Sequence, residues 1–375
     1  MRTRLLVILS VAALLGLYAG MNAAQAFPAH PLAALAGSVL FVALFIGWQI
    51  AYRKAALPEN SWAARAISWA TSIGMGAWAT FLILSAMAAA AGFLLSPLLR
   101  GLVFSRVLPE AALAVAVVLA FLGLGQAVRG PRVVEVPIAV PGLAPGLRGL
   151  RIAQISDLHA GNTIERGYVE SIVRRVQELK PDLIAVTGDL ADGTVAQIVR
   201  RVEPLSRLHA PLGVYYVTGN HEYYWNAPEW VQKARELGFT PLLNASRILE
   251  RGGARLFIAG VPDDFGGAFI PGHKPDMAKA AAGGESCDFR ILLAHRPGAA
   301  LAAERAGFDL QLSGHTHGGQ FFPASLFIGL FHRYARGLAR RGRLQIYVNP
   351  GTGYWGPAHR FAVPAEITLL TLSEA

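Results

Sequence analysis

Hydrophobic and polar residues are distributed differently in the two parts of this chain. Up to residue 128 the apolar residues form long runs, whereas the remainder shows short runs separated by polar segments. A helix of about 20 apolar residues crosses a hydrocarbon core about 30 Å thick. We therefore predict four membrane-spanning helices within residues 1–130, over Leu5–Ala26, Leu32–Tyr52, Ile67–Leu99 and Ala111–Val128.

The first apolar run has a second interpretation. Arg2 and Arg4 precede it and Ala24-Gln25-Ala26 ends it, which is also the pattern of a signal peptide with a cleavage site. Both interpretations place the C-terminal part on the same side of the membrane, because three spans that start outside also end inside.

Basic residues beside the apolar runs predict the orientation of the chain, because Lys and Arg gather on the cytoplasmic side. They precede the first run, separate the second from the third and follow the fourth, whereas Arg100 and Arg106 in the third loop point the other way. We expect the N-terminus and the whole C-terminal part in the cytoplasm. The residues that favour this orientation are Arg2, Arg4, Arg53, Lys54, Arg65, Arg129 and Arg132.

From residue 131 onward the pattern is that of an α/β protein. Residues 131–149 hold four prolines and a Val/Ile alternation, which predicts a linker with an edge strand. Residues 150–375 alternate strand-like and helix-like runs, which favours layers of sheet and helix. The strand-like runs are 150–156, 183–187, 213–218, 256–261, 289–294, 309–313, 344–348, 366–372 and a short one near Ile248, and the helix-like runs are 164–179, 194–208, 227–237 and 298–306.

Composition supports a membrane location. The chain is 53% hydrophobic and only 15% charged, with a net charge of +10. A basic chain suits nucleic acid or an anionic membrane surface. With apolar spans attached, the membrane is the simpler partner, and we expect no nucleic acid. The single cysteine, Cys287, excludes an internal disulfide.

Metal-binding residue types follow five of the predicted strands, at the carboxyl ends where α/β sheets bind ligands. A single case is explained as well by an Asp that caps a helix or a His that fills a turn. Five strand ends together indicate one site, and two histidines at i and i+2 directly after the strand 309–313 suggest a metal. The residues are Asp157, His159, Asp189, Asn220, His221, His295, His315 and His317.

The order of these blocks resembles the calcineurin-like metallophosphoesterase family. D-x-H, G-D-x-x-D, G-N-H-E, a lone His after a strand and G-H-x-H appear in the family's order over about residues 150–352. The resemblance implies a four-layer α/β/β/α sandwich over residues 150–375, with a two-metal centre at one sheet edge. The expected fold is therefore N-terminal transmembrane helices followed by an α/β metallophosphoesterase domain.

The resemblance also implies a role for each site residue. Asp189 would bridge both metals, and His221 would be the acid near the leaving oxygen. A mixed oxygen and nitrogen set without thiolates suits Mn, Fe or Zn, and a two-metal pair can clamp a phosphoryl group for attack by a bridging hydroxide. The first metal would be held by Asp157, His159, Asp189 and His317, and the second by Asp189, Asn220, His295 and His315.

Two further features leave alternatives open. Asp192 either orients metal ligands from behind or caps the helix that begins near Thr194. The segment Phe321–Arg343 combines aromatic and aliphatic residues with arginines. It is either a core hairpin with a basic end or a membrane-facing lip for a lipid's acyl chain and anionic head group. Histidines outside the blocks, His30, His209, His273, His332 and His359, are interpreted as surface or core residues.

We expect a membrane-anchored dimetal phosphohydrolase that cleaves a phosphodiester or pyrophosphate. The variants Ala294-His295-Arg296-Pro297 and His221-Glu222-Tyr223-Tyr224 resemble a membrane-attached bacterial branch of the family. Some relatives there hydrolyse the pyrophosphate of UDP-2,3-diacylglucosamine in lipid A synthesis, so a lipid-linked phosphoester at a bacterial-type inner membrane is expected, with a multi-pass anchor. The alternatives are a membrane-bound sensor without turnover and a nucleotide phosphodiesterase.

Overall fold

A computed structural model describes positions 32 and 36 and residues 62–95 and 104–375. Helix α3 (Trp62–Leu95) and helix α4 (Phe104–Val128) correspond to the third and fourth predicted spans. Within them, residues 65–88 and 111–128 are long and apolar enough to cross a membrane, and only 28% of each window is buried in the protein. The first two predicted spans fall outside the described residues, apart from positions 32 and 36.

Large apolar side chains of α4 remain exposed along much of its length, as a lipid-facing helix requires. They include Leu113, Val115, Val118, Phe121 and Leu122. Helix α4 ends at Val128, and the first strand begins at Arg132, so little chain separates the helix from the sheet.

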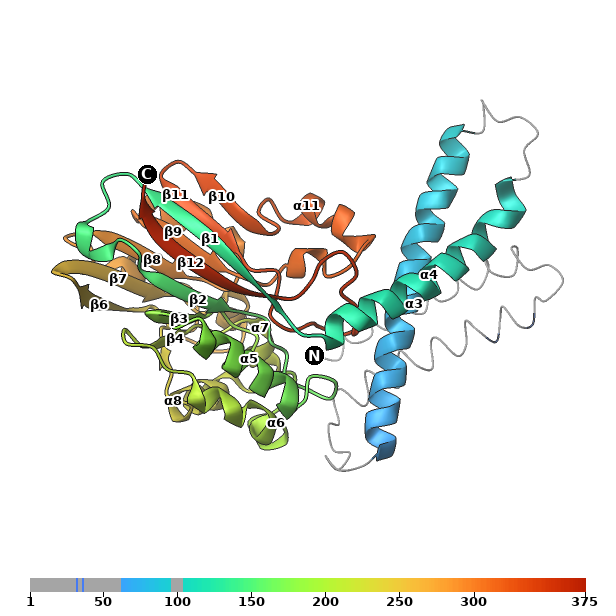
Figure 1. The fold of residues 1–375 in the computed structure, drawn as a ribbon, viewed down its shortest axis with the longest axis horizontal. Coiled ribbons are helices and arrows are strands. Elements are labelled where there is room, and N and C mark those ends of the chain that lie inside the picture. Colours follow the sequence, from blue (N-terminus) through green and yellow to red (C-terminus); the bar gives the residue numbers. More distant parts are fainter. Residues whose placement is uncertain (1–31, 33–35, 37–61, 96–103) are drawn as a thin grey trace.

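The rest of the described chain is built on two six-stranded sheets with helices packed against them (Figure 1). In the first sheet β2 to β5 run parallel to one another, β12 runs antiparallel to β2, and β1 forms one edge. The order is β1 (Arg132–Val140), β12 (Glu366–Glu374), β2 (Arg151–Ile155), β3 (Leu183–Val186), β4 (Val214–Tyr216) and β5 (Thr240–Pro241).

The second sheet has a parallel centre and an antiparallel strand at each edge. Its parallel strands β7, β8, β9 and β11 end on the same side, as β2, β3 and β4 do in the first sheet. The order is β10 (Gly337–Arg341), β11 (Leu344–Val348), β9 (Leu310–Ser313), β8 (Phe289–Leu293), β7 (Ala254–Gly260) and β6 (Ala245–Arg251).

The helices pack through one apolar face each. Helix α5 (Arg166–Glu178) buries Val169, Ile172, Val173 and Val176, the i, i+3, i+4, i+7 spacing of an amphipathic helix. It shares a hydrophobic cluster with the first sheet, α6 (Val195–Val202) and α8 (Ala227–Glu236). The other helices are α7 (Asn220–Tyr224), α9 (Met277–Ala281), α10 (Ala300–Arg305) and α11 (Ile328–Phe331).

A second cluster contains residues of both sheets, including Ile152 and Leu183 of the first and Leu256 and Ile291 of the second. Polar contacts join the two sheets near their carboxyl ends. Gln154 Nε2 on β2 donates to the carbonyl oxygen of Ser313 on β9 at 2.9 Å. Because a lost buried hydrogen bond costs about 1–3 kcal/mol, this contact fixes the two strand ends relative to each other.

Most predicted strands and helices are present, and the short elements α7, α9 and β5 occur where none was predicted. Two predicted segments also differ. The helix predicted over 194–208 stops at Val202, and a 3₁₀ turn with a proline at its start covers Glu203–Arg207. Pro204 lacks the N–H that an α-helix would need there. The segment Phe321–Arg343 holds a 3₁₀ turn at Ala324–Leu326, helix α11 and strand β10, rather than a simple hairpin.

Candidate metal centre

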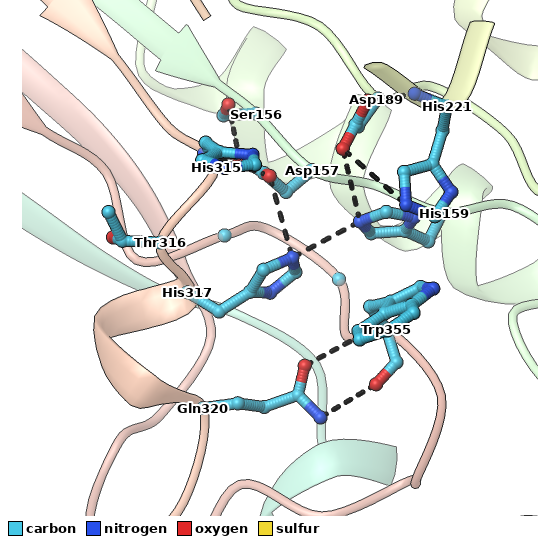
Figure 2. Close-up of polar contacts among 12 residues, drawn as sticks. Ser156, Asp157, His159, Asp189, His221, His315, Thr316, His317, Gln320 and Trp355 are labelled. Atoms are coloured by element: carbon cyan, nitrogen blue, oxygen red, sulfur yellow. Dashed lines mark hydrogen bonds and ion pairs between the residues drawn. The ribbon is translucent and has the colours of Figure 1, made fainter. Parts of the chain in front are cut away.

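The predicted site residues gather where the parallel strands of both sheets end. Asp157 and His159 follow β2, Asp189 follows β3, and His221 lies in α7 after β4. His295 follows β8, and the loop after β9 carries His315 and His317. Figure 2 shows most of these side chains pointing toward one another from different strands.

Three groups of these residues are spaced as a metal ion requires. In each group the candidate ligand atoms lie within 4.8 Å of one another. The groups are Asp157, His159 and His317, then His159, Asp189 and His221, and finally Asp189, His295 and His315. Because Asp189 belongs to two groups and His159 links them to the first, the groups form one continuous centre.

The candidate ligand atoms of the first group lie close together. His159 Nε2 lies 3.1 Å from His317 Nε2, and His317 Nε2 lies 3.4 Å from Asp157 Oδ1. His159 Nδ1 lies 3.1 Å from Asp192 Oδ1, a carboxylate that can only accept. The proton of neutral His159 is therefore on Nδ1, which leaves the Nε2 lone pair facing His317.

Asp189 lies at the centre of the site. Its Oδ2 is 3.2 Å from His295 Nε2, 3.8 Å from His159 Nε2 and 4.0 Å from His221 Nε2. Its Oδ1 accepts a hydrogen bond from the backbone N–H of His221 at 2.8 Å. The carboxylate is thus anchored through one oxygen while the other faces three imidazoles.

Two buried candidate ligand atoms form no hydrogen bond of regular geometry, which tests whether the residues fit a metal. They are Asn220 Oδ1 and His295 Nε2, of which the latter lies 3.2 Å from Asp189 Oδ2. His295 Nδ1 lies 2.7 Å from the carbonyl oxygen of Thr187, so Nδ1 donates, and in the neutral imidazole Nε2 carries the lone pair. Unpaired buried acceptors are costly, and a divalent cation with oxygen and nitrogen ligands would satisfy both.

The backbone at the site adopts an unfavourable conformation. Five of the candidate ligands have positive φ angles, although none is a glycine: Asp157 at 52°, His159 at 51°, Asp189 at 54°, His315 at 71° and His317 at 51°. Such conformations cost about 1–3 kcal/mol each and cluster at functional sites. Here they turn the side chains inward directly after each strand.

Glycines allow the loops to approach the carboxylates. A Cβ on Gly219 would lie 2.1 Å from Asp189 Oδ1, and a Cβ on Gly314 would lie 2.1 Å from Asp157 Oδ2. Any side chain at these positions would displace the carboxylates. The glycines of the G-N-H-E and G-H-x-H blocks therefore allow the backbone to come close to the carboxylates of Asp189 and Asp157.

Asp192 lies behind two histidines of the site. Its Oδ1 is 3.1 Å from His159 Nδ1 and 2.5 Å from His221 Nδ1. The N-cap of α6 is Thr194, which forms a capping box with Gln197. Of the two predictions for Asp192, the structure therefore favours contact with the histidines over helix capping.

Charges around the carboxylates shift their pKa values in opposite directions. Burial would raise the pKa of Asp189, but the imidazoles of His295 and His221 hold it well below its ordinary value. Burial raises the pKa of Asp157, and burial together with the Arg360 guanidinium holds the pKa of His317 well below its ordinary value. Neutral His317 and ionised Asp189 are the forms that bind a metal.

Sequence reasoning assigned no role to Glu222, although it stands in the G-N-H-E block. Its buried carboxylate accepts hydrogen bonds from the backbone N–H groups of Asp189 at 3.1 Å, Leu190 at 2.7 Å and Gly219 at 2.6 Å. It therefore ties the loop after β3 to the loop after β4. Its place in the G-N-H-E block, directly after His221, was the only sign in the sequence that it has a role.

Comparisons with known proteins place the chain in a family. A model of the calcineurin-like phosphoesterase family matches residues 150–319. The chain is 39% identical over 273 residues to the transmembrane protein with metallophosphoesterase domain of Danio rerio, covering 70% of this chain and 62% of that protein. It is 33% identical over 235 residues to the uncharacterized metallophosphoesterase YkuE of Bacillus subtilis, covering 60% of this chain and 80% of that protein.

Groups of Asp and His that could hold metal ions thus lie at the strand ends of two sheets. The chain belongs to the calcineurin-like phosphoesterase family. It spans less than two thirds of the Danio rerio protein, at 62%. A solved 5'-nucleotidase precursor from Thermus thermophilus is similar at 16% identity with a TM-score of 0.36, covering 55% of this chain and 49% of that chain. Because animal and bacterial proteins both match, the bacterial branch inferred from the sequence stays a prediction.

Proposed function

We propose that the chain is a membrane-anchored phosphoester hydrolase whose site holds two divalent ions, of Mn, Fe or Zn. The position of Asp189 carries this proposal. Its Oδ2 lies 3.2 Å from His295 Nε2 and 3.8 Å from His159 Nε2. One carboxylate placed between two histidine groups suits a pair of ions about 3.5–4 Å apart.

The proposed ligand sets follow from the groups described above. Asp157, His159 and His317 would hold the first ion, and His295, His315 and Asn220 would hold the second. Asp189 would contribute to both. Two such ions act as Lewis acids on a phosphoryl oxygen and lower the pKa of water at the site.

The chain's own residues orient the substrate and move a proton. His221 lies beside the metal groups without being needed in either ligand set, and Asp192 holds its Nδ1 at 2.5 Å. Its Nε2 is thereby directed into the site, 4.0 Å from Asp189 Oδ2. We assign His221 the transfer of a proton to the leaving oxygen.

The domain plan extends the proposal. Residues 1–130 anchor the chain as a multi-pass region in the inner membrane, 131–149 link and add an edge strand, and 150–375 form a cytoplasmic catalytic domain. The four-layer order is supported by three hydrophobic clusters, because one contains both sheets and the others join each sheet to its own helices.

Turnover separates this function from a binding-only sensor. The purified chain with Mn²⁺ is expected to hydrolyse bis-p-nitrophenyl phosphate, to stop after chelation and to recover when Mn²⁺ returns. A protein that binds Mn²⁺ and the diester without releasing p-nitrophenol would be a sensor, and the proposal would fall.

We also propose a lipid-linked phosphoester as substrate, of the kind UDP-2,3-diacylglucosamine represents. Helix α11 and the turn before it expose Leu326, Phe327, Leu330 and Phe331, which we call the α11 patch. The next residue, His332, packs its ring 5.6 Å from the ring of the candidate ligand His315. The α11 patch therefore reaches from solvent to the edge of the metal centre.

The lipid proposal rests on the apolar residues of the α11 patch and not on the last arginines of the segment Phe321–Arg343. Arg341 pairs with Glu304 at 2.7 Å, and Arg343 pairs with Asp309 at 3.0 Å. These two arginines contact the second sheet and its helix. Leu330 and Phe331, each 79% exposed, have no such structural role.

Replacing Leu330 and Phe331 by Ser should therefore reduce turnover of a micellar lipid phosphodiester while sparing bis-p-nitrophenyl phosphate. A buried methylene contributes about 0.8 kcal/mol, so the loss for the lipid should exceed about tenfold. Leu301→Ser on α10, at a residue 42% exposed, is the control. Equal loss on both substrates, or no loss on either, would remove the lipid proposal and leave the hydrolase.

A further inference from the structure

The segment Gly353–Phe361, which we call the 353–361 loop, lies between β11 and β12 and contacts both membrane-type helices. Ser72 Oγ on α3 accepts a hydrogen bond from the Ala358 N–H at 2.7 Å and donates to the carbonyl oxygen of Gly356 at 3.1 Å. On α4, the Gly123 carbonyl oxygen accepts from the Arg360 N–H at 3.1 Å. Backbone bonds of this kind fix the loop against both helices.

His359 fills the space between the two helices. A Cβ on Gly123 would lie 1.6 Å from His359 Nδ1, and a Cβ on Gly76 would lie 3.3 Å from His359 Cβ. His359 Nε2 lies 3.1 Å from Thr80 Oγ1, and the buried ring stacks on Phe321 with centroids 4.4 Å apart. Gly76 and Gly123 therefore create the space that this imidazole occupies.

The next residue, Arg360, connects the same loop to the metal centre. Its side chain is fully buried. Nη1 donates to the carbonyl oxygens of Pro350 at 2.7 Å and His317 at 3.3 Å, and Nη2 lies 3.2 Å from His317 Nδ1. The other ring nitrogen of His317 faces Asp157 and His159. The guanidinium thus holds the backbone of one candidate ligand and lies beside its ring.

A second contact joins the loop to the turn that carries His317. Gln320 Nε2 donates to the carbonyl oxygens of Trp355 at 2.8 Å and Pro357 at 3.1 Å, and its Oε1 accepts from the Trp355 N–H at 2.8 Å (Figure 2). The Trp355 ring lies 5.8 Å from the His221 ring. The loop therefore touches residues on both sides of the site.

We infer that Arg360 is a positioning residue for His317, and that α3 and α4 hold Arg360 in place through His359. The inference rests on the proposed metal-binding role of His317. Helices that anchor the chain are then also part of the support of the metal centre. Gly76 and Gly123 make room for His359, and the buried Arg360 guanidinium, which has no carboxylate partner among its described contacts, links the loop to His317.

The test uses the full-length protein in detergent or nanodiscs and measures binding of Mn²⁺ to the metal-stripped chain. Wild type should bind two Mn²⁺ ions with two successive dissociation constants. Arg360→Met should raise one of them by about 10–100-fold, the usual effect of losing a residue that orients a ligand. The other constant should stay unchanged, because His317 belongs to only one proposed ligand set. A general loss of structure would weaken both.

Gly123→Ala tests the helix end of the connection. The added methyl group overlaps His359, so Mn²⁺ binding at the same position should weaken, and His359→Ala in the Gly123→Ala background should recover part of it. Gly125→Ala is the matched control on α4, because a Cβ there meets nothing within 4 Å.

The outcomes distinguish this inference from the proposed function. If wild type binds none of Mn²⁺, Fe²⁺ and Zn²⁺, the proposed function and the inference both fall. If wild type binds two ions and Arg360→Met binds them equally well, the inference alone is wrong. If Gly123→Ala and Gly125→Ala bind Mn²⁺ equally well, and thermal unfolding shows that both variants are folded, the helices do not support the site.

Discussion

Asp189→Ala should abolish turnover and lower the metal content at both positions. One carboxylate faces both histidine groups, so its removal affects both ions at once. A metal contributes several kcal/mol of transition-state stabilisation, and each tenfold in rate corresponds to about 1.4 kcal/mol. We therefore expect a loss of at least about 10³-fold in kcat, measured with bis-p-nitrophenyl phosphate, together with metal analysis of the purified variant.

Asp182→Ala is the control for this substitution. Asp182 accepts from the Arg151 N–H at 2.8 Å and pairs with Arg251 at 3.6 Å, at the opposite ends of β2 and β3. It should keep metal and activity even if stability falls. An Asp189→Ala chain that retains two ions would show that Asp189 does not bridge them.

His221→Ala should retain both ions and lose turnover by about 10²–10⁴-fold, the usual contribution of a general acid. The backbone N–H of His221 still bonds Asp189 Oδ1 in this variant, so the carboxylate keeps its anchor. The loss should be smaller for p-nitrophenyl esters than for alkyl esters, because a good leaving group needs less protonation. The measurement is kcat for a matched series of diesters.

A different pattern would assign His221 another role. Equal losses of kcat across the series would show that His221 does not transfer a proton to the leaving oxygen. Loss of one ion would make it a ligand, which its position in the group with His159 and Asp189 would then explain.

The strand ends and the family were predictable from the sequence because the information is local. Strand-like runs end one or two residues before Asp157, Asp189 and His315, and the parallel topology then brings these ends together. The order of the blocks was enough to indicate the family. The structure adds the distances that group the residues, and it leaves the identity of each ligand as a proposal.

The supporting residues were not predictable, because their partners are far away in the sequence. His359 and Thr80 are separated by 279 positions, and nothing near His359 marks it as a residue packed between helices. The same holds for Arg360, whose partners are mostly backbone carbonyls. Positive φ angles at Asp157 and His317 were also hidden, because sequence preferences assign such angles to glycine.

The membrane half shows a different limit of pattern reading. Hydropathy predicted helices for α3 and α4, since a run of apolar residues is its own signal. It did not show that Ser72, Gly76 and Thr80 lie on one face of α3, spaced four residues apart, against the 353–361 loop. Small polar residues in an apolar run mark such contacts only when the partner is known.

The number of ions required for turnover tests the central claim most directly. Metal-stripped wild-type chain is titrated with Mn²⁺ while hydrolysis of bis-p-nitrophenyl phosphate and bound metal per chain are followed together. The account predicts that activity saturates at two ions per chain. Full activity at one ion per chain, or none at two, would contradict it.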